Sequence, residues 1–336
     1  MQTRHFTIPV FIPQKCCPFQ CVFCNQQKIT GKDDIPGPTD IARIIDEHLA
    51  TIPVKNSVIE VGFFGGNFTG IPYQEQEQYL EAVQPYLADK RISSIRLSTR
   101  PDYISQEILD LLKKYKVETI ELGAQSFDDE VLTRSARGHS ASDITVASKM
   151  IHSSGFRLGL QMMIGLPGDT LEKAILTTQE IISLGAIETR IYPVLVIKGT
   201  KMEEWYKQGL YQPLSLDETI YWLKTIMPMF EEAGVEITRV GLHSSVGLLS
   251  GKELIAGPFH TSIRELAMTE VWWDRLKDLI NQDKHGKLQL AVHPSQYNFA
   301  IGYFSKNRKK LLKHFSSVSF IKDKSLKNNQ FYVDHS

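Results

Sequence analysis

Four cysteines fall within nine residues near the start of the chain, and the rest of its 336 residues contains no other cysteine. Three of them, Cys17, Cys21 and Cys24, have the spacing C-x3-C-x2-C. Three thiolates on one short loop can each bind a different iron of a [4Fe–4S] cluster, which leaves the fourth iron without a protein ligand. An open metal position is where a substrate or cosubstrate can be activated. The spacing therefore predicts a catalytic iron–sulfur cluster, with Cys16 as a bystander thiol.

Two other uses of these cysteines compete with this prediction. Disulfides are disfavoured, because four cysteines within nine residues cannot crosslink a long chain and nothing in the sequence suggests secretion. A structural zinc ion needs four ligands, and Cys16 is a poor fourth because its side chain should diverge from that of Cys17. A distant histidine could complete such a site, so zinc stays an alternative to the cluster.

The composition is that of a globular protein, since 42% of the residues are hydrophobic, 23% are charged and the formal net charge is zero. No apolar run approaches the roughly 18–20 residues of a membrane span. Residues 1–5 lead almost directly into an apolar run and leave no room for a signal peptide. We therefore expect a cytoplasmic protein without membrane contact, in a compartment that is reducing enough for an exposed cluster.

Short apolar runs alternate with longer amphipathic stretches, which is the pattern of βα units around a parallel sheet. The apolar runs predict strands at Phe6–Ile12, Val58–Phe64, Ile95–Leu97, Thr119–Leu122, Arg157–Ile164 and Thr189–Val194. The amphipathic stretches predict helices at Thr39–Ala50, Gln74–Leu87, Ser105–Tyr115, Ser142–Ser153 and Leu171–Leu184. One more helix and strand follow, at Leu216–Ala233 and Val235–Val240. The expected fold is α/β, a partial TIM-like (β/α)6 barrel with an additional βα unit, and its site should lie at the C-terminal ends of the strands.

Distinctive motifs stand where these strands end. The second strand runs into Gly65-Gly66-Asn67, and paired glycines let a backbone approach a ligand so closely that its carbonyls can accept a hydrogen bond from an ammonium group. The next three strands lead into Ser98-Thr99-Arg100-Pro101-Asp102, into Gln125-Ser126-Phe127 with Arg137-Gly138-His139, and into Gln161 with Gly165-Leu166-Pro167-Gly168. The fork-shaped cation of Arg137 suits a carboxylate ligand. Each motif alone is a weak signal, but the ordered set is specific.

The cysteine spacing, with Phe23 just before the third cysteine, resembles the signature loop of the radical S-adenosylmethionine (radical SAM) superfamily. The motifs after it resemble one branch of that superfamily, which contains the catalytic subunit of the Elongator complex and, more distantly, the oxygen-independent coproporphyrinogen oxidases. Three blocks resemble the Elongator subunit in particular: Thr99–Asp102, Ile191-Tyr192-Pro193 through Val196–Thr200, and Ser262–Ala267. The resemblance covers roughly residues 5–268. No glycine-rich acetyl-CoA loop is visible, so acetyl transfer is not expected.

The resemblance implies a cluster on Cys17, Cys21 and Cys24 whose free iron takes the amino and carboxylate groups of S-adenosylmethionine. One electron, from a reductant such as flavodoxin or ferredoxin, then cleaves the sulfonium to give a 5′-deoxyadenosyl radical. The resemblance also implies that this cosubstrate is bound by Gly65, Gly66, Asn67, Ser98, Gln125, Arg137, Gln161, Gly165 and Pro167. At three of these positions the chain departs from its relatives: Asn67 stands where many have an acid, and Ser98 and Gln161 stand where the coproporphyrinogen oxidases have a glutamate and an aspartate.

Residues 269–336 are expected to form a small basic α+β module after a barrel domain of residues 1–268. Residues 303–336 hold eight basic and two acidic residues, a net charge of +6 that the rest of the chain balances. The expected element order in the module is strand, helix, loop, helix, strand and strand, with Gly302 and Ser305 in the loop. This order resembles a degenerate KH domain, in which a Gly-x-x-Gly loop clamps a nucleic-acid backbone, although Ser305 replaces the second glycine. The module is therefore a candidate RNA-binding part, or else a solvated basic cap.

These features predict a radical SAM enzyme that modifies an RNA, tRNA foremost, and binds it through the basic module. A reaction on a tetrapyrrole or another small molecule is the first alternative, and a non-catalytic iron–sulfur or zinc protein that binds RNA is the second. His139, His243 and His260 lie near the predicted strand ends and could act as acids or bases around neutral pH, although structural roles are commoner for such histidines.

Overall fold

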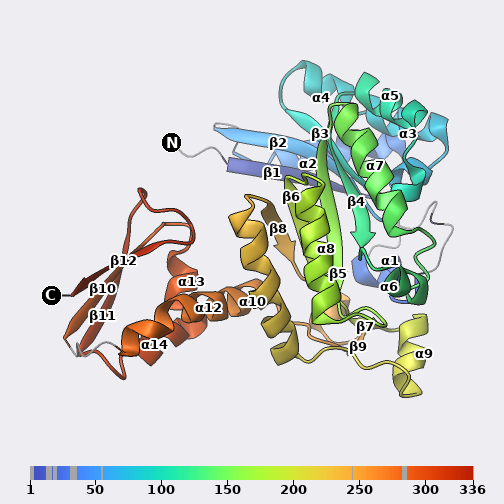
Figure 1. Cartoon of the computed structure of the whole chain (residues 1–336). Helices are drawn as coiled ribbons and strands as arrows, with labels where there is room; N and C mark the ends of the chain where they lie inside the picture. The colour runs from blue at the N-terminus through green and yellow to red at the C-terminus, as the bar shows by residue number, and fades with distance from the viewer. Residues whose placement is uncertain are drawn as a thin grey trace.

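The computed structural model describes residues 4–12, 17, 21–30, 36–53, 56–243, 245–281 and 286–335. Cys16, which we expect to be a bystander, lies outside the described residues. In the described part of the chain, seven strands form one parallel sheet in the order β1-β2-β3-β4-β5-β6-β8. These strands are β1 (Arg4–Phe11), β2 (Ser57–Phe64), β3 (Ser94–Thr99), β4 (Val117–Gln125), β5 (Arg157–Ile164), β6 (Glu188–Pro193) and β8 (Glu236–Val240). The sheet curls into a half-barrel (Figure 1), so the predicted α/β barrel with its additional unit is confirmed.

The connecting helices lie mainly on the outer, convex side of the sheet (Figure 1). They are α2 (Ile41–Leu49), α3 (Tyr73–Glu81), α4 (Gln84–Ala88), α5 (Gln106–Lys114), α6 (Asp129–Arg134), α7 (Ala141–Ser153), α8 (Leu171–Ser183) and α10 (Leu216–Glu232). Hydroxyl side chains at Ser105, Ser140, Thr170 and Ser215 accept hydrogen bonds from first-turn N–H groups of the helices that follow them. Such N-caps fix where each helix starts, and they explain why most helix boundaries fall close to the predicted ones.

One predicted helix is divided in the structure. The stretch Gln74–Leu87, expected to be continuous, forms α3 and α4 with a break between Glu81 and Gln84. Pro85 lies in the first turn of α4. Because proline has no N–H group, it cannot donate to the carbonyl four residues earlier, but it fits the first turn of a new helix.

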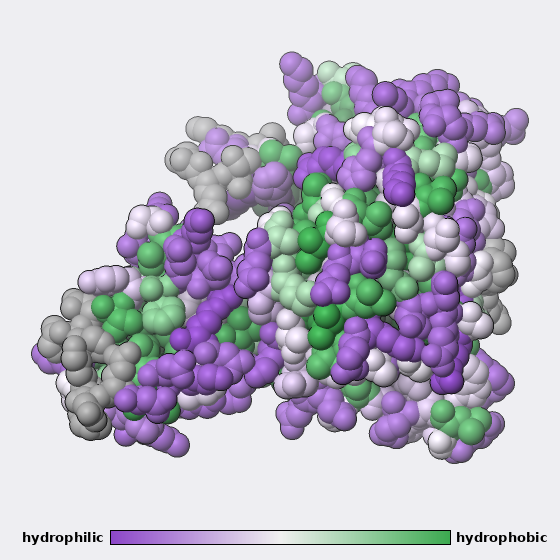
Figure 2. All heavy atoms as spheres, in the orientation of Figure 1, coloured by the Kyte–Doolittle hydropathy of each residue, from purple (hydrophilic) through white to green (hydrophobic). Residues whose placement is uncertain are grey.

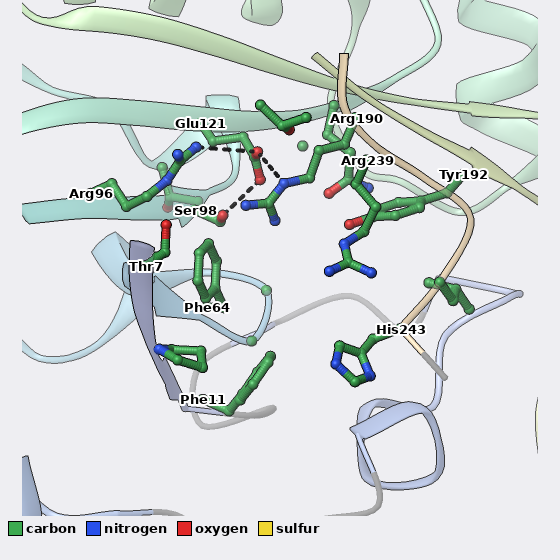
Figure 3. A pocket seen from close by; sticks show the side chains of 18 of the residues that line it. Thr7, Phe11, Phe64, Arg96, Ser98, Glu121, Arg190, Tyr192, Arg239 and His243 are labelled. Atoms are coloured by element: carbon green, nitrogen blue, oxygen red, sulfur yellow. Dashed lines mark hydrogen bonds and ion pairs between the residues drawn. The ribbon is translucent and has the colours of Figure 1, made fainter. Parts of the chain in front are cut away.

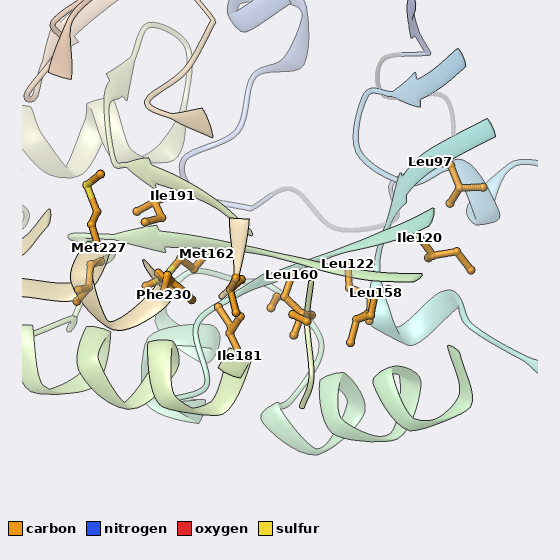
Figure 4. Close-up of a cluster of buried hydrophobic side chains, with 14 of the residues drawn as sticks. Leu97, Ile120, Leu122, Leu158, Leu160, Met162, Ile181, Ile191, Met227 and Phe230 are labelled. Atoms are coloured by element: carbon orange, nitrogen blue, oxygen red, sulfur yellow. The ribbon is translucent and has the colours of Figure 1, made fainter. Parts of the chain in front are cut away.

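The main hydrophobic core lies between the sheet and the outer helices. Aliphatic residues of neighbouring strands, including Leu97, Leu122 and Leu160, are fully buried. Figure 4 shows these side chains on the face of the strands that meets the helices, where Ile181 of α8 and Phe230 of α10 pack against them. Close packing on this one face holds the sheet in its curl and leaves the opposite face free for other residue types.

Small elements close the C-terminal ends of the strands. They are α1 (Gln26–Thr30), β7 (Val196–Ile197), α9 (Lys201–Lys207), α11 (Val246–Leu249) and β9 (Leu254–Ala256), and β7 pairs with β9 in an antiparallel ribbon. An ion pair between Lys28 Nζ and Glu253 Oε2, 2.7 Å apart, ties α1 to the segment before β9. The first segment after the cysteines is thereby fixed to a part of the chain far away in sequence.

The C-terminal residues form the expected α+β arrangement, which α12 (Ile263–Leu276) joins to the barrel (Figure 1). Its elements are β10 (Lys287–Val292), α13 (Tyr297–Ile301), the 3-10 helix η5 (Tyr303–Ser305), α14 (Lys306–Leu311), β11 (Ser317–Lys322) and β12 (Phe331–His335). The sheet order is β11-β10-β12, with β11 parallel and β12 antiparallel to β10. The division expected after residue 268 lies inside α12, and it stays a prediction.

Polar contacts anchor α12 on both sides. Arg275 and Lys224 form ion pairs with Glu231 and Asp274 across the contact between α12 and α10, at 2.8 and 2.7 Å. The fully buried Trp272 donates a hydrogen bond from Nε1 to Gln296 Oε1 in the module, at 3.0 Å.

Figure 2 shows hydrophilic side chains gathered over α12 and α14. Within the described residues, none of the helices combines the length and the apolar character that crossing a membrane requires.

Candidate functional site

The cysteine loop follows β1 and is held at its middle. Val22 belongs to a small apolar cluster with Val131 and Met202. Its N–H donates to the carbonyl of Ser135 at 3.2 Å, and its carbonyl accepts from the N–H of Met202 at 2.9 Å. Two segments distant in sequence therefore fix the loop between its second and third cysteines.

All three predicted cluster ligands line one cavity of about 1260 Å3 inside the half-barrel. Cys17 is exposed and Cys21 is buried, and none of the three forms a disulfide. Burial, together with the nearby thiolates of Cys21 and Cys17, raises the pKa of Cys24 to about 12. Thiols that repel each other's charge in this way are suited to sharing a cation, because a bound metal deprotonates its thiol ligands.

Arg137 brings a cation to the same place. Its Nη1 donates to Cys21 Sγ at 3.4 Å, and its Nη2 donates to the carbonyl of Gly123 at 2.7 Å. Its own carbonyl accepts a hydrogen bond from Arg100 Nη2 at 2.6 Å, which holds the segment in place. The buried Nε has no hydrogen-bond partner among the described residues. A buried donor of this kind, beside the cysteines, has a hydrogen bond left for an anionic ligand.

The paired glycines after β2 leave open space beside the cysteine loop. Gly65 and Gly66 have φ angles of 122° and 116°, in the region that favours glycine. Among the described residues, a Cβ built on Gly66 would have only Gln26 Nε2 within 4 Å, at 3.6 Å. Both glycines line the cavity, so their backbone is accessible to a ligand there.

Three further predicted residues line the cavity, and hydrogen bonds hold their side chains in position. Ser98 Oγ donates to Glu121 Oε1 at 2.7 Å, and Gln161 Nε2 donates to Gln125 Oε1 at 3.1 Å. Gln125 has φ +69° at an irregularity in the pairing of β4 with β5. A non-glycine residue with positive φ is uncommon, and such backbone strain clusters at functional sites.

The other predicted cosubstrate residues lie behind the cavity wall. Asn67 is buried and accepts a hydrogen bond from Thr99 Oγ1 at 2.8 Å, which links the ends of β2 and β3. The backbone N–H of Gly165 donates a hydrogen bond to Asp169 Oδ2 at 2.8 Å, and its carbonyl accepts one from the hydroxyl of Tyr211 at 2.6 Å. Pro167 is also buried, and none of Asn67, Gly165 and Pro167 lines the cavity. Their part in binding the cosubstrate stays a prediction.

The inner face of the sheet carries rows of polar side chains (Figure 3), in which Ser98 and Gln161 were expected at the site but the arginines and glutamates were not. Strand register places Arg96, Thr119 and Arg157 in one row, Ser98, Glu121, Gly159, Glu188 and Glu236 in the next, and Gly123, Gln161, Arg190 and Arg239 in the row nearest the strand C-termini. Part of the signal was present in the sequence, because alternate residues of the central strands are polar or glycine, as Thr119, Glu121 and Gly123 are in β4. The apolar residues of these strands predicted the sheet, but the polar residues between them were not used to predict the site.

Ion pairs connect these rows. Arg96 contacts Glu188, and its Nη1 lies 3.1 Å from Glu60 Oε1. Arg190 Nε lies 3.0 Å from Glu121 Oε2. Burial opposes the charge of Arg96, but the surrounding carboxylates outweigh it and raise the pKa of that guanidinium. The inner face is thus charged and hydrogen-bonded, which keeps it polar and open to ligands.

The three candidate histidines are not brought together. Burial and the neighbouring Arg137 lower the pKa of His139 to about 4, and its Nε2 lies 3.3 Å from the carbonyl of Ala124. A neutral, hydrogen-bonded imidazole fits the structural role. His260 accepts from the N–H of Ser262 at 3.0 Å and does not line the cavity. Of the three candidates, only His243 lines the cavity.

These residues fit an iron–sulfur cluster with an amino-acid ligand better than a single metal ion. Among the described residues, no three His, Cys, Asp or Glu side chains converge as the ligands of one metal ion would. A cluster needs no such convergence, because each thiolate binds a different iron. The thiols, the donor of Arg137 and the open backbone at Gly66 supply partners for the cluster, a carboxylate and an ammonium group.

Comparison with known families gives two matches. The model of the radical SAM superfamily matches residues 11–181, and that of the radical SAM C-terminal domain matches residues 188–272.

The chain is also similar to individual proteins. It is 29% identical to the tRNA uridine(34) acetyltransferase of Methanocaldococcus infernus over 262 residues, which cover 64% of this chain and 48% of that protein. It is 26% identical to Elongator complex protein 3 of Saccharomyces cerevisiae over 262 residues, 72% of this chain and 45% of that protein. The chain thus spans about half the length of these relatives. A solved structure of Methanocaldococcus infernus Elp3 superposes with a TM-score of 0.62 over 83% of this chain and 64% of that chain, at 20% identity, and shares its fold.

Proposed function

The chain belongs to the radical SAM superfamily of enzymes, and we propose that it holds a [4Fe–4S] cluster and uses S-adenosylmethionine to modify an RNA, tRNA foremost. The observation that carries this proposal is the position of Cys17, Cys21 and Cys24 at one polar cavity beside Arg137. The relatives named for tRNA uridine support the choice of RNA.

The residues of this chain would divide the work as follows. Cys17, Cys21 and Cys24 hold the cluster, Arg137 binds the carboxylate of S-adenosylmethionine, and the carbonyls at Gly65 and Gly66 accept from its ammonium group. Ser98, Gln125 and Gln161 line the cavity between these groups and the barrel interior. When bound, the reduced cluster and S-adenosylmethionine together supply a 5′-deoxyadenosyl radical. A flavodoxin or ferredoxin would provide the electron.

We place the RNA-binding surface of the C-terminal module at the aromatic side chains of its loop, because the two cations next to the loop, which were expected to form a phosphate clamp, already contact groups of the protein. Lys306 is paired with Glu270 at 2.7 Å, and Arg308 Nε donates to the carbonyl of Val318 at 3.2 Å. The most prominent side chain of the loop is instead Phe304, which is 79% exposed and contacts the ring of Tyr303 at 4.5 Å. Exposed aromatic rings beside cations are suited to stacking unpaired bases.

Cluster binding and cosubstrate cleavage test the enzymatic part. Anaerobically reconstituted protein should bind one [4Fe–4S] cluster and release 5′-deoxyadenosine from S-adenosylmethionine when it is reduced. Serine at Cys17, Cys21 or Cys24 should abolish the cluster signal, whereas Cys16→Ser is the matched control and should keep it. Full iron and sulfide content in Cys21→Ser would refute the ligand assignment.

The RNA part needs a separate measurement. Nucleosides of total tRNA from cells with and without the gene, compared by mass spectrometry, should differ by one modified nucleoside. Purified protein with S-adenosylmethionine and a reductant should restore it on the deficient tRNA. Tight tRNA binding without any 5′-deoxyadenosine would instead support the non-catalytic RNA-binding alternative.

A further inference from the structure

The inner wall of the cavity carries a second group of residues beyond those assigned to the cosubstrate. Phe11 of β1, Phe64 of β2, Arg190 of β6, Arg239 of β8 and His243 all line the cavity. We propose that these five residues, named here the inner subsite, bind one nucleotide of the RNA substrate, with its base against the two phenylalanines and its phosphate at Arg239 and His243. The proposal rests on the proposed function and names the part of the substrate that enters the cavity.

Phe11 and Phe64 form an aromatic wall. Their ring centroids lie 6.0 Å apart with a 43° angle between the rings, and the guanidinium of Arg190 lies over Phe64, 4.7 Å from its centroid. Both phenylalanines line the cavity and are only partly buried. Apolar rings that remain accessible inside a charged cavity are suited to a flat, partly apolar ligand such as a base.

Arg239 supplies a cation that the protein itself does not neutralise. Arg190, its neighbour in the same row, is paired with Glu121. No carboxylate lies within ion-pair distance of Arg239 in the described ranges of the chain, and its side chain is exposed to the cavity. Figure 3 shows Arg239 and His243 across the cavity from Phe64 and Phe11. A fork-shaped cation opposite an aromatic wall matches a phosphate joined to a base.

The size of the cavity leaves room for this second ligand. Its volume of about 1260 Å3 exceeds the roughly 300–1,000 Å3 of ordinary small-molecule sites. Arg137, assigned to the cosubstrate, lies with the cysteines and the end of β4, whereas Arg190 and Arg239 of the inner subsite lie on β6 and β8. Phe64 directly precedes Gly65 and Gly66, so the two ligands would lie side by side at the end of β2, with the phosphate of the nucleotide directed towards β8.

Nucleotide affinity of the full-length protein, reconstituted with its cluster, tests the inner subsite. Uridine monophosphate, uridine and inorganic phosphate are titrated separately by calorimetry under nitrogen. We expect uridine monophosphate to bind at least about tenfold more tightly than either fragment, since a charge-assisted contact adds to the base contact. Arg239→Gln should lower its affinity to that of uridine and leave uridine itself within twofold. Arg157→Gln, which removes an exposed arginine from a lower row of the same wall, is the matched control and should change neither.

Three outcomes would overturn the inner subsite. If Arg239→Gln and Arg157→Gln lowered the affinity for uridine monophosphate equally, the effect would be one of general charge. If phosphate and uridine monophosphate bound with equal affinity, the site would bind anions without contacting the base. The affinity for S-adenosylmethionine should stay unchanged in Arg239→Gln, and a loss of it would place Arg239 in the cosubstrate site instead. These titrations do not depend on turnover, so a failure to modify tRNA with intact nucleotide binding would refute the reaction and not the inner subsite.

Discussion

The two faces of the curled sheet are built from alternate residues of the same strands, yet they differ in almost every physical property. Along β5, Leu158, Leu160 and Met162 are fully buried against the outer helices. The residues between and after them, Gly159, Gln161 and Met163, face the interior, and the last two line the cavity. Successive side chains of a strand point to opposite faces, so one eight-residue strand can serve a hydrophobic core and a polar site at once.

The comparison shows how the fold tolerates a polar inner face without losing stability. The outer face contributes the hydrophobic stabilisation of the barrel, while the inner face pairs most of its charges with each other. Glycine at inward positions gives the long side chains room, since a Cβ on Gly159 would stand 3.0 Å from Glu188 Oε1. In a closed barrel this interior would be packed with branched aliphatic residues. Here the open, charged interior is the space in which a substrate can bind.

Breaking the inner network should have the largest effect on stability. Arg96→Gln leaves Glu188 buried without its partner and removes one of the two arginines that contact Glu121, and we expect a loss of about 3–5 kcal/mol in the free energy of unfolding. Urea denaturation measures it. Adding Glu188→Gln to Arg96→Gln should recover part of the loss, because one uncompensated charge is removed. A single variant as stable as the parent would show that the inner rows do not support the fold.

Truncation on the outer face should cost somewhat less and should spare the site. Leu160 is fully buried, so Leu160→Ala should lower the free energy of unfolding by about 2–5 kcal/mol through lost burial and a cavity. The neighbouring Gln161→Ala should change stability little and weaken binding of S-adenosylmethionine. Denaturation and calorimetry on both variants check the contrast. If Leu160→Ala impaired cosubstrate binding as much as Gln161→Ala in the folded state, the two faces would not be separable.

Acid should destabilise the protein through His139, which is buried between α6 and α7 beside the carbonyl of Ala124 in β4. Burial lowers its pKa from 6.5 to about 4, so the unfolded chain binds the proton more readily between these values. The contribution of His139 to stability is complete above about pH 6.5 and is lost as the pH falls towards 4, by at most about 3 kcal/mol. Unfolding measured from pH 7 to pH 4 should show this slope, and His139→Gln should flatten it. An equal slope in both proteins would assign the effect to other groups.

The smallest expected effect lies outside the barrel, at the exposed loop of the module. Phe304 has φ 49° and ψ 33°, a left-handed conformation that costs a non-glycine residue about 1 kcal/mol. Phe304→Gly should therefore keep or slightly raise the melting temperature while it weakens binding of single-stranded RNA. Leu210→Ala removes a comparably exposed apolar side chain from the barrel and should leave RNA binding unchanged. Undiminished RNA binding by Phe304→Gly would remove this loop from the RNA surface.

Much of the architecture could be read from local sequence. The period of apolar residues marked all seven strands of the main sheet, because burial of one face imposes it on each strand separately. The error at Gln74–Leu87 came from weighing amphipathic periodicity above Pro85, whose missing N–H decides the matter. The cysteine loop could be named from its spacing, whereas the cavity-lining residues Gly65, Gly66, Ser98, Gln125, Arg137 and Gln161 were named because their motifs resemble those of the radical SAM superfamily. They share one cavity because strand ends meet at one edge of a parallel sheet.

The sequence by itself determined the cysteine spacing, the strand and helix types and the family to which they belong, because each depends on residues close together in the chain. Only the tertiary structure decided which side chains share the cavity. Arg190 and Arg239 are forty-nine positions apart and become neighbours through the pairing of β6 with β8, while Phe11 joins Phe64 through the pairing of β1 with β2. The register of strand pairing decides which residues become neighbours in this way, and a shift of one residue would turn every inward side chain of a strand outward. That register is a property of the whole packed sheet, and no local pattern specifies it.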